Sequence, residues 1–267
     1  MRQELILLIL VLICFSCDKV EQSEFTDSPI LTGYLHPGEY FTIDISRQTP
    51  FSSDITYSGD DINNLSLQVE RNGEFHTLLA LGDGKYIDST IVVAENDNYG
   101  LSFQFNSKTV TGYTYIPTKP TNATQSAIEL YVDRVDSGTF GPPPMSMPDP
   151  IKISWDNSDH SYYLILIENI ESSLDPIRDF GDNGPPSNIF RKQPTSLSSE
   201  EIGAREFQYF GTHRVVIYHV LPDYAALYDD NSSSSQNLSN PSTSIVNGYG
   251  IFTGMNSDTL WIEVKEN

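Results

Sequence analysis

The feature that most constrains the fold of this chain is a two-residue alternation of apolar and polar side chains. Segments 41–46, 65–70 and 99–105 each place apolar residues on one face and polar residues on the other. Successive side chains of a strand point to opposite faces of a sheet, so this pattern predicts half-buried β-strands. Because 38% of the residues are hydrophobic and 11% aromatic, the chain has enough apolar side chains for a core, which excludes a wholly disordered protein.

The first half of this alternating region predicts an immunoglobulin-like β-sandwich over residues 30–118. Asn72-Gly73 supplies a hairpin turn, because both residue types adopt positive φ readily. Tyr99 enters a strand after Asp97-Asn98 and resembles the tyrosine corner of immunoglobulin-like domains. Pro117 and Pro120 then end the last strand, and we expect a domain boundary there.

The second half predicts a larger β-sandwich over residues 121–267. Alternation over 151–156, followed by a continuous apolar run over 162–167, resembles the second and third strands of a fibronectin type III module. Residues of about 172–204 are polar and rich in Pro, Gly and Ser, so we expect a long flexible insertion or lid. One short helix is expected over 222–230.

The amino terminus has the pattern of an export signal. Residues 5–13 form an apolar run that is much shorter than the roughly 20 residues of a membrane-spanning helix. Small Ser16 follows as a cleavage position, and Cys17 comes next, which resembles a bacterial lipobox. The prediction is a lipoprotein signal peptide over 1–16, lipidation of Cys17, and a polar tether over 17–29. An ordinary signal peptide or an anchor is the alternative.

The chain has two cysteines, Cys14 and Cys17, and both lie in this segment. Cys14 is the weaker lipid acceptor, because β-branched Ile13 precedes it. Cleavage after residue 16 leaves one cysteine, which the lipid occupies. We therefore expect no intrachain disulfide, although an exported compartment permits one.

The net charge of −21 excludes some classes of partner. An acidic surface repels the phosphates of nucleic acid, so no nucleic-acid partner is expected. It also disfavours a basic membrane-binding surface. Attachment to a membrane is therefore expected only through the lipid.

Catalytic signatures are missing from the sequence. The chain has no His-Glu-x-x-His, Gly-x-Ser-x-Gly or phosphate-binding glycine loop. Gly248-Tyr-Gly250-Ile-Phe-Thr-Gly254 lacks the following helix of a dinucleotide site, and its glycines instead suit close packing of strands. No cofactor, metal or catalytic residue is predicted. The remaining candidates, interpreted as ordinary surface or core residues and solvated turns, are His36, His76, His160, His213, His219 and the acidic pairs at 60–61, 156–159, 179–182 and 229–230.

One stretch is similar to a known family. Residues 240–254, Asn-Pro-Ser-Thr-Ser-Ile-Val-Asn-Gly-Tyr-Gly-Ile-Phe-Thr-Gly, resemble the carboxyl-terminal signature of the lipoprotein family catalogued as domain of unknown function 4249. Segments 30–35, 40–46 and 113–117 are similar to other strands of that family, and the resemblance spans roughly 17–264. It implies an envelope lipoprotein, often associated with TonB-dependent outer-membrane transporters, and it implies no activity or functional residues.

These observations predict a non-catalytic binding or accessory protein at the outer membrane, with an unknown ligand. A TonB-dependent transporter is the expected partner. The alternative is a carbohydrate-binding lipoprotein, because exposed aromatic rings stack on sugars. The aromatic candidates for that role are Tyr40, Tyr113, Tyr131 and Trp261.

Overall fold

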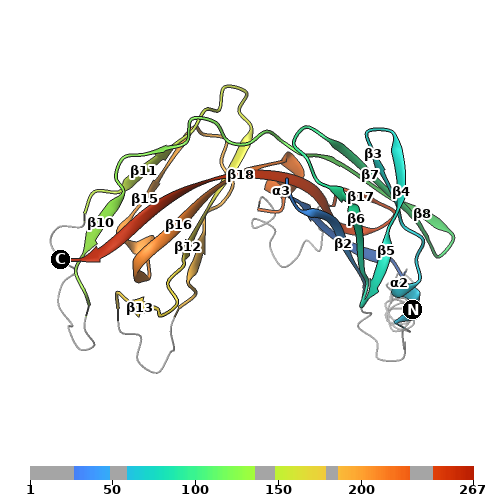
Figure 1. Ribbon diagram of the computed structural model, residues 1–267, viewed down its shortest axis with the longest axis horizontal. Coiled ribbons are helices and arrows are strands. Elements are labelled where there is room, and N and C mark those ends of the chain that lie inside the picture. Colours follow the sequence, from blue (N-terminus) through green and yellow to red (C-terminus); the bar gives the residue numbers. More distant parts are fainter. Residues whose placement is uncertain (1–26, 49–58, 136–147, 179–185, 229–242) are drawn as a thin grey trace, which may run out of the picture.

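The computed structural model describes residues 27–48, 59–135, 148–178, 186–228 and 243–267. These residues form an all-β, sandwich-like protein, as the alternation predicted. Figure 1 shows an arch of two halves, with the last strand, β18 (Tyr249–Glu266), running from one half into the other.

The largest sheet has ten strands and extends through both halves. In this sheet β18 lies between β16 (Tyr209–Val220) of the second half and β1 (Pro29–Leu35), the first described strand of the chain. In spatial order the path is β14 (Ile189–Arg191), β12 (Tyr162–Asn169), β16 (Tyr209–Val220), β18, β1 (Pro29–Leu35), β2 (Tyr40–Arg47), β6 (Lys85–Val92) and β5 (Leu79–Gly82), with β10 (Glu129–Val132) paired to β18 and β13 (Asp175–Pro176) to β16.

Two smaller sheets complete the sandwiches. A five-stranded sheet covers the first half, in the order β17 (Ile245–Val246), β8 (Lys108–Tyr115), β7 (Asn98–Phe105), β3 (Gln68–Arg71) and β4 (Glu74–Thr77). A three-stranded sheet covers the second half, in the order β15 (Ser199–Ile202), β11 (Ile151–Ser154) and β9 (Thr124–Gln125). The described helices are short: α2 (Asp60–Asn63), α3 (Pro222–Ala226) and the 3-10 turn η2 (Ala204–Glu206).

The core of the first half confirms the predicted alternation of buried and exposed side chains. Phe41 is fully buried on β2, and its ring lies 5.5 Å from that of Tyr99 and 6.1 Å from that of Phe252. The predicted turn is confirmed by positive φ at Asn72 and Gly73. The Tyr99 hydroxyl accepts a hydrogen bond from the Ala94 N–H at 3.3 Å, which ties the start of β7 to the loop before it.

The sequence patterns predict two separate strands over 250–254 and 259–264, but β18 is continuous over both. Its first third pairs in parallel with β1, and its remainder pairs antiparallel with β16. Residues 121–267 were assigned to the second sandwich, but Ile245 and Phe252 lie in the core of the first. The polar residues between the two expected strands do not break β18, because Asn256 donates hydrogen bonds to the Pro117 carbonyl and to Glu95 where the two halves meet.

The segment 172–204, expected as a flexible insertion or lid, forms paired strands in its described part. In its described part, β13, β14 and β15 each pair with a strand of the second half, while 179–185 lie outside the described residues. Ile177 and Ile202 are buried in the second core. These isolated apolar residues are too few to produce an alternating pattern, so the segment has the composition of a loop although it supplies edge strands.

Candidate functional site

The ten-stranded sheet has one face turned away from both smaller sheets, here called the open face. Strand alternation decides which side chains reach it: Phe252 and Ile262 of β18 enter the two cores, so Ile251 and Met255 point the other way. α3 packs on this open face. Leu164, Val220, Tyr224, Ile251 and Met255 form a third, small apolar cluster there.

A cavity of about 230 Å³ opens beside this cluster, where the two halves share the sheet. Its walls come from β1, β12, β14, β16, β18 and α3. The side chains that line it are Tyr34, His36, Leu164, Leu166, Arg191, Tyr218, Tyr224 and Met255.

Register explains why these residues meet. Leu164 pairs with Tyr218 across β12 and β16, and Leu166 pairs with Arg191 across β12 and β14, so all four side chains share the open face. Tyr34 reaches the same face because its neighbours Gly33 and Leu35 are buried.

The helix α3 closes one wall of the cavity. Pro222 occupies the first helical position, where its fixed φ favours a helix and its missing N–H costs nothing. This start brings the ring of Tyr224 edge-on to that of Tyr34, with 6.1 Å between their centroids.

Arg191 is the principal cation of the cavity. A hydrogen bond to the Tyr228 hydroxyl raises the pKa of Arg191, so its guanidinium stays charged. Among the described residues no carboxylate lies within 4.0 Å of it. The neighbouring Arg214 differs, because it is paired with Glu168.

The other titratable groups of the cavity are neutral at pH 7. Burial raises the pKa of both Tyr218 and Tyr224, so their hydroxyls remain protonated. Burial lowers the pKa of His36, against the opposing effect of Glu39. Neutral hydroxyls and one cation suit binding of a ligand through hydrogen bonds and charge. No carboxylate that could serve as a general base appears among the residues lining the cavity.

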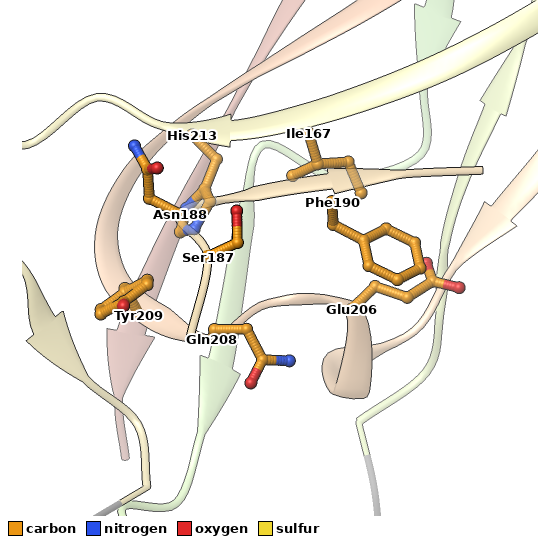
Figure 2. A pocket seen from close by; sticks show the side chains of 8 residues that line it. All are labelled: Ile167, Ser187, Asn188, Phe190, Glu206, Gln208, Tyr209 and His213. Carbon is orange, nitrogen blue, oxygen red and sulfur yellow. The ribbon is translucent and has the colours of Figure 1, made fainter. Parts of the chain in front are cut away.

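A second crevice surrounds His213, and Figure 2 shows it with Tyr209, Asn188 and Phe190 among the labelled side chains. Its volume is about 10 Å³, roughly the space needed for one water molecule. An organic ligand does not fit there.

His213 itself has a structural role in the core. Its Nδ1 lies 3.0 Å from the Gly211 carbonyl, which only accepts, so the proton is on Nδ1. Nε2 then accepts from the Asn169 amide at 3.3 Å. Burial lowers the pKa of His213 to about 4, and the imidazole is neutral at pH 7.

The other histidines are spread over the molecule. His219 stacks on Tyr163 and bonds to the Thr118 carbonyl, while His76 lies 3.3 Å from Asp88. His160 has positive φ in a turn. In the described part of the chain, no three His, Cys, Asp or Glu residues are grouped as metal ligands.

The acidic candidates are also separated. Asp61 pairs with Arg47, Asp156 accepts hydrogen bonds from Thr121 and Asn122, and Asp159 bonds to Ser161. Residues 179–182 and 229–230 lie outside the described residues.

The four aromatic candidates divide between two sheets. Tyr40, Tyr131 and Trp261 alternate with buried core residues of the ten-stranded sheet and lie on its open face. Tyr113 instead projects from the five-stranded sheet, where its hydroxyl bonds to Asn98. Trp261 is 49% exposed and has area available for stacking.

The predicted lipidation site, Cys17, lies outside the described residues, together with the signal segment 1–16. Its modification therefore stays a prediction. Among the residues that the structure does describe, no helix has the length and hydrophobicity required to span a bilayer.

Sequence reasoning missed the cavity residues Tyr34, Arg191 and Tyr218. Their polar or amphipathic side chains fit the exposed side of any strand, and β14 was assigned to a loop. The one signal in the sequence was the high number of tyrosines at non-core positions of strands. It could not show which tyrosines come together, because Tyr34 is more than 100 residues from Arg191 and Tyr218 in the sequence. The chain matches no family model and no curated protein.

Proposed function

We propose that this protein is a lipid-anchored protein of the cell envelope that binds a ligand or partner without transforming it. Its proposed place is the outer membrane, beside a TonB-dependent transporter. The anchor rests on Cys17, which follows the short apolar run and Ser16. The transporter rests on the resemblance of residues 17–264 to a lipoprotein family.

The observation that carries the binding role is the cavity of about 230 Å³ on the open face. It lies where strands of both halves meet, which is a common place for ligand sites. Its walls combine apolar side chains with a few polar groups. None of the residues that line it is a carboxylate that could act as a general acid, general base or nucleophile.

We also infer that the first sandwich is immunoglobulin-like and the second fibronectin type III-like. The hydrogen bond between the Tyr99 hydroxyl and the Ala94 N–H supports the first assignment, because a tyrosine corner bonds back to the chain a few residues upstream. Both families present loops and sheet faces to partners, which agrees with a binding role.

The anchor is tested by replacing its acceptor. Cys17→Ser is expected to release the protein from the membrane fraction and to abolish incorporation of labelled palmitate, whereas Cys14→Ser changes neither. Lipid on the Cys17→Ser protein would refute the assignment. At native expression, affinity purification is expected to recover an outer-membrane transporter, and its repeated absence would refute that partner.

Carbohydrate binding is the second candidate, because Tyr34, Tyr218 and Tyr224 line the cavity and Trp261 lies on the same face. Tyrosine and tryptophan rings offer flat apolar surfaces with polar edges. A glycan array is the direct test, with Trp261→Ala expected to weaken any sugar that binds on the open face. Binding to no glycan would remove this candidate.

A further inference from the structure

We propose that the cavity binds a small organic anion with a single ring, and that Arg191 contacts the carboxylate or phosphate group of that ligand. This inference deepens the proposed binding function and rests on it. The ligand class follows from the charge, the walls and the size of the cavity.

The charge comes from Arg191. Its planar guanidinium presents several N–H donors in a geometry that matches carboxylate and phosphate oxygens. Pairing of Leu166 with Arg191 places it on the open face. Arg214 on the same face is paired with Glu168, whereas the hydrogen bond that raises the pKa of Arg191 goes to the neutral Tyr228 hydroxyl.

The tyrosine hydroxyls add neutral donors to this cation. Tyr218 and Tyr224 stay protonated because they are buried, so an incoming anion meets O–H groups and no second negative charge. A ligand with an amine is disfavoured. Its ammonium group would face the guanidinium without a carboxylate on the cavity wall.

The walls and the size define the rest of the ligand. Leu164, Leu166 and Met255 line the cavity together with the ring of Tyr34, so a flat apolar body is covered on several sides. The volume of about 230 Å³ lies just below the roughly 300–1,000 Å³ of pockets that enclose drug-sized ligands. That is room for one substituted ring and excludes a peptide or an oligosaccharide as the enclosed group.

The experiment compares matched charged and neutral probes by isothermal titration calorimetry on the purified full-length protein. Benzoate and benzamide have nearly the same shape and differ in charge. Phenyl phosphate distinguishes a phosphate site from a carboxylate site, and glucuronate against glucose distinguishes an acidic sugar from an aromatic acid. At least one anion is expected to bind about tenfold or more tightly than its neutral partner, as for a hydrogen bond to a charged group.

Variants assign that preference to Arg191. Arg191→Gln is expected to abolish the preference for the anion, and Arg191→Lys is expected to retain part of it. Arg205→Gln is the matched control, because Arg205 is an exposed arginine of the same half that does not line the cavity. It is expected to bind like the wild type.

The comparison of charged and neutral probes on the wild-type protein needs no variant. It therefore tests the proposal even if a substitution disturbs folding. Equal binding of charged and neutral probes overturns the proposal, as does binding of none at about 10 mM. Equal losses in Arg191→Gln and Arg205→Gln also overturn it. Recovery of a transporter without anion binding would refute this inference alone, whereas anion binding without membrane attachment would refute only the anchor.

Discussion

The close approach of the two sheets at Gly254 makes a sharp prediction for Gly254→Ala. Gly254 lies in β18, and its N–H donates to the Thr114 hydroxyl of β8 at 2.8 Å, which joins the ten-stranded sheet to the five-stranded one. A Cβ at this position would lie 2.1 Å from the Tyr115 carbonyl oxygen and 2.8 Å from Ile116 Cδ1.

The magnitude follows from that geometry. Real Cβ atoms keep at least 3.0 Å from other heavy atoms, and the nearest obstacle here is backbone, which cannot rotate away. The sheets must therefore separate by nearly 1 Å. Overpacking of this kind costs about 1–3 kcal/mol, and a buried donor that loses its partner costs about 1–3 kcal/mol more. We expect Gly254→Ala to lower the free energy of unfolding by about 2–6 kcal/mol.

The assay is equilibrium unfolding in urea, followed by far-ultraviolet circular dichroism and by tryptophan fluorescence. Gly203→Ala is the control, because a Cβ there meets no heavy atom within 4 Å and the backbone is extended. This control is expected to change stability by about 0.5 kcal/mol or less. Equal midpoints for the two variants would refute the steric reasoning.

Fluorescence also tests whether the halves unfold together. Trp155 and Trp261 both belong to the second half, whereas Gly254 packs against the first. Because β18 pairs with strands of both halves, the Gly254→Ala transition is expected to move equally in both signals. A shift in circular dichroism alone would show that the halves unfold separately.

Two further substitutions test other parts of the core. Because the pKa of His213 is about 4 in the folded protein and near 6.5 unfolded, the unfolded state binds more protons as pH falls from 6.5 to 4. The contribution of neutral His213 to stability is therefore complete above pH 6.5, and it falls by on the order of 3 kcal/mol toward pH 4. In urea unfolding between pH 6.5 and 4, His213→Gln is expected to make the midpoint less dependent on pH. A pH dependence equal to that of the wild type would refute the role of His213. Phe252→Ala is expected to cost about 3–5 kcal/mol in urea, because Phe252 is fully buried against Phe41, while Val246→Ala at an exposed position is expected to cost less than 1 kcal/mol.

Local patterns predicted the strands of the first half well. Phe41 alternates with polar neighbours and Asn72-Gly73 forms its turn, because both features depend on residues close together in sequence. The glycine spacing over 248–254 also indicated close strand packing, and Gly250 has positive φ with the Leu31 carbonyl beside it. A Cβ at Gly250 would lie 1.9 Å from that oxygen.

Pairing over long distances was not predictable. Nothing near Phe252 indicates that its ring enters a core built from residues 31–116, because alternation specifies a face and leaves the partner open. The cavity was not predictable for the same reason. Tyr34, Arg191 and Tyr218 belong to three strands that share one sheet only because β18 joins the two halves.

The position of β18 also bears on when the chain can fold. It follows every other described strand in sequence, yet β1 takes one of its two neighbours from it, more than 200 residues away. Domains usually fold from the amino terminus as synthesis proceeds, but here neither sandwich acquires its full set of strands until residues 249–266 arrive. Such a chain remains incomplete during synthesis, and we expect it to fold slowly, because the pairing of β1 with β18 closes a loop of almost the whole described polypeptide.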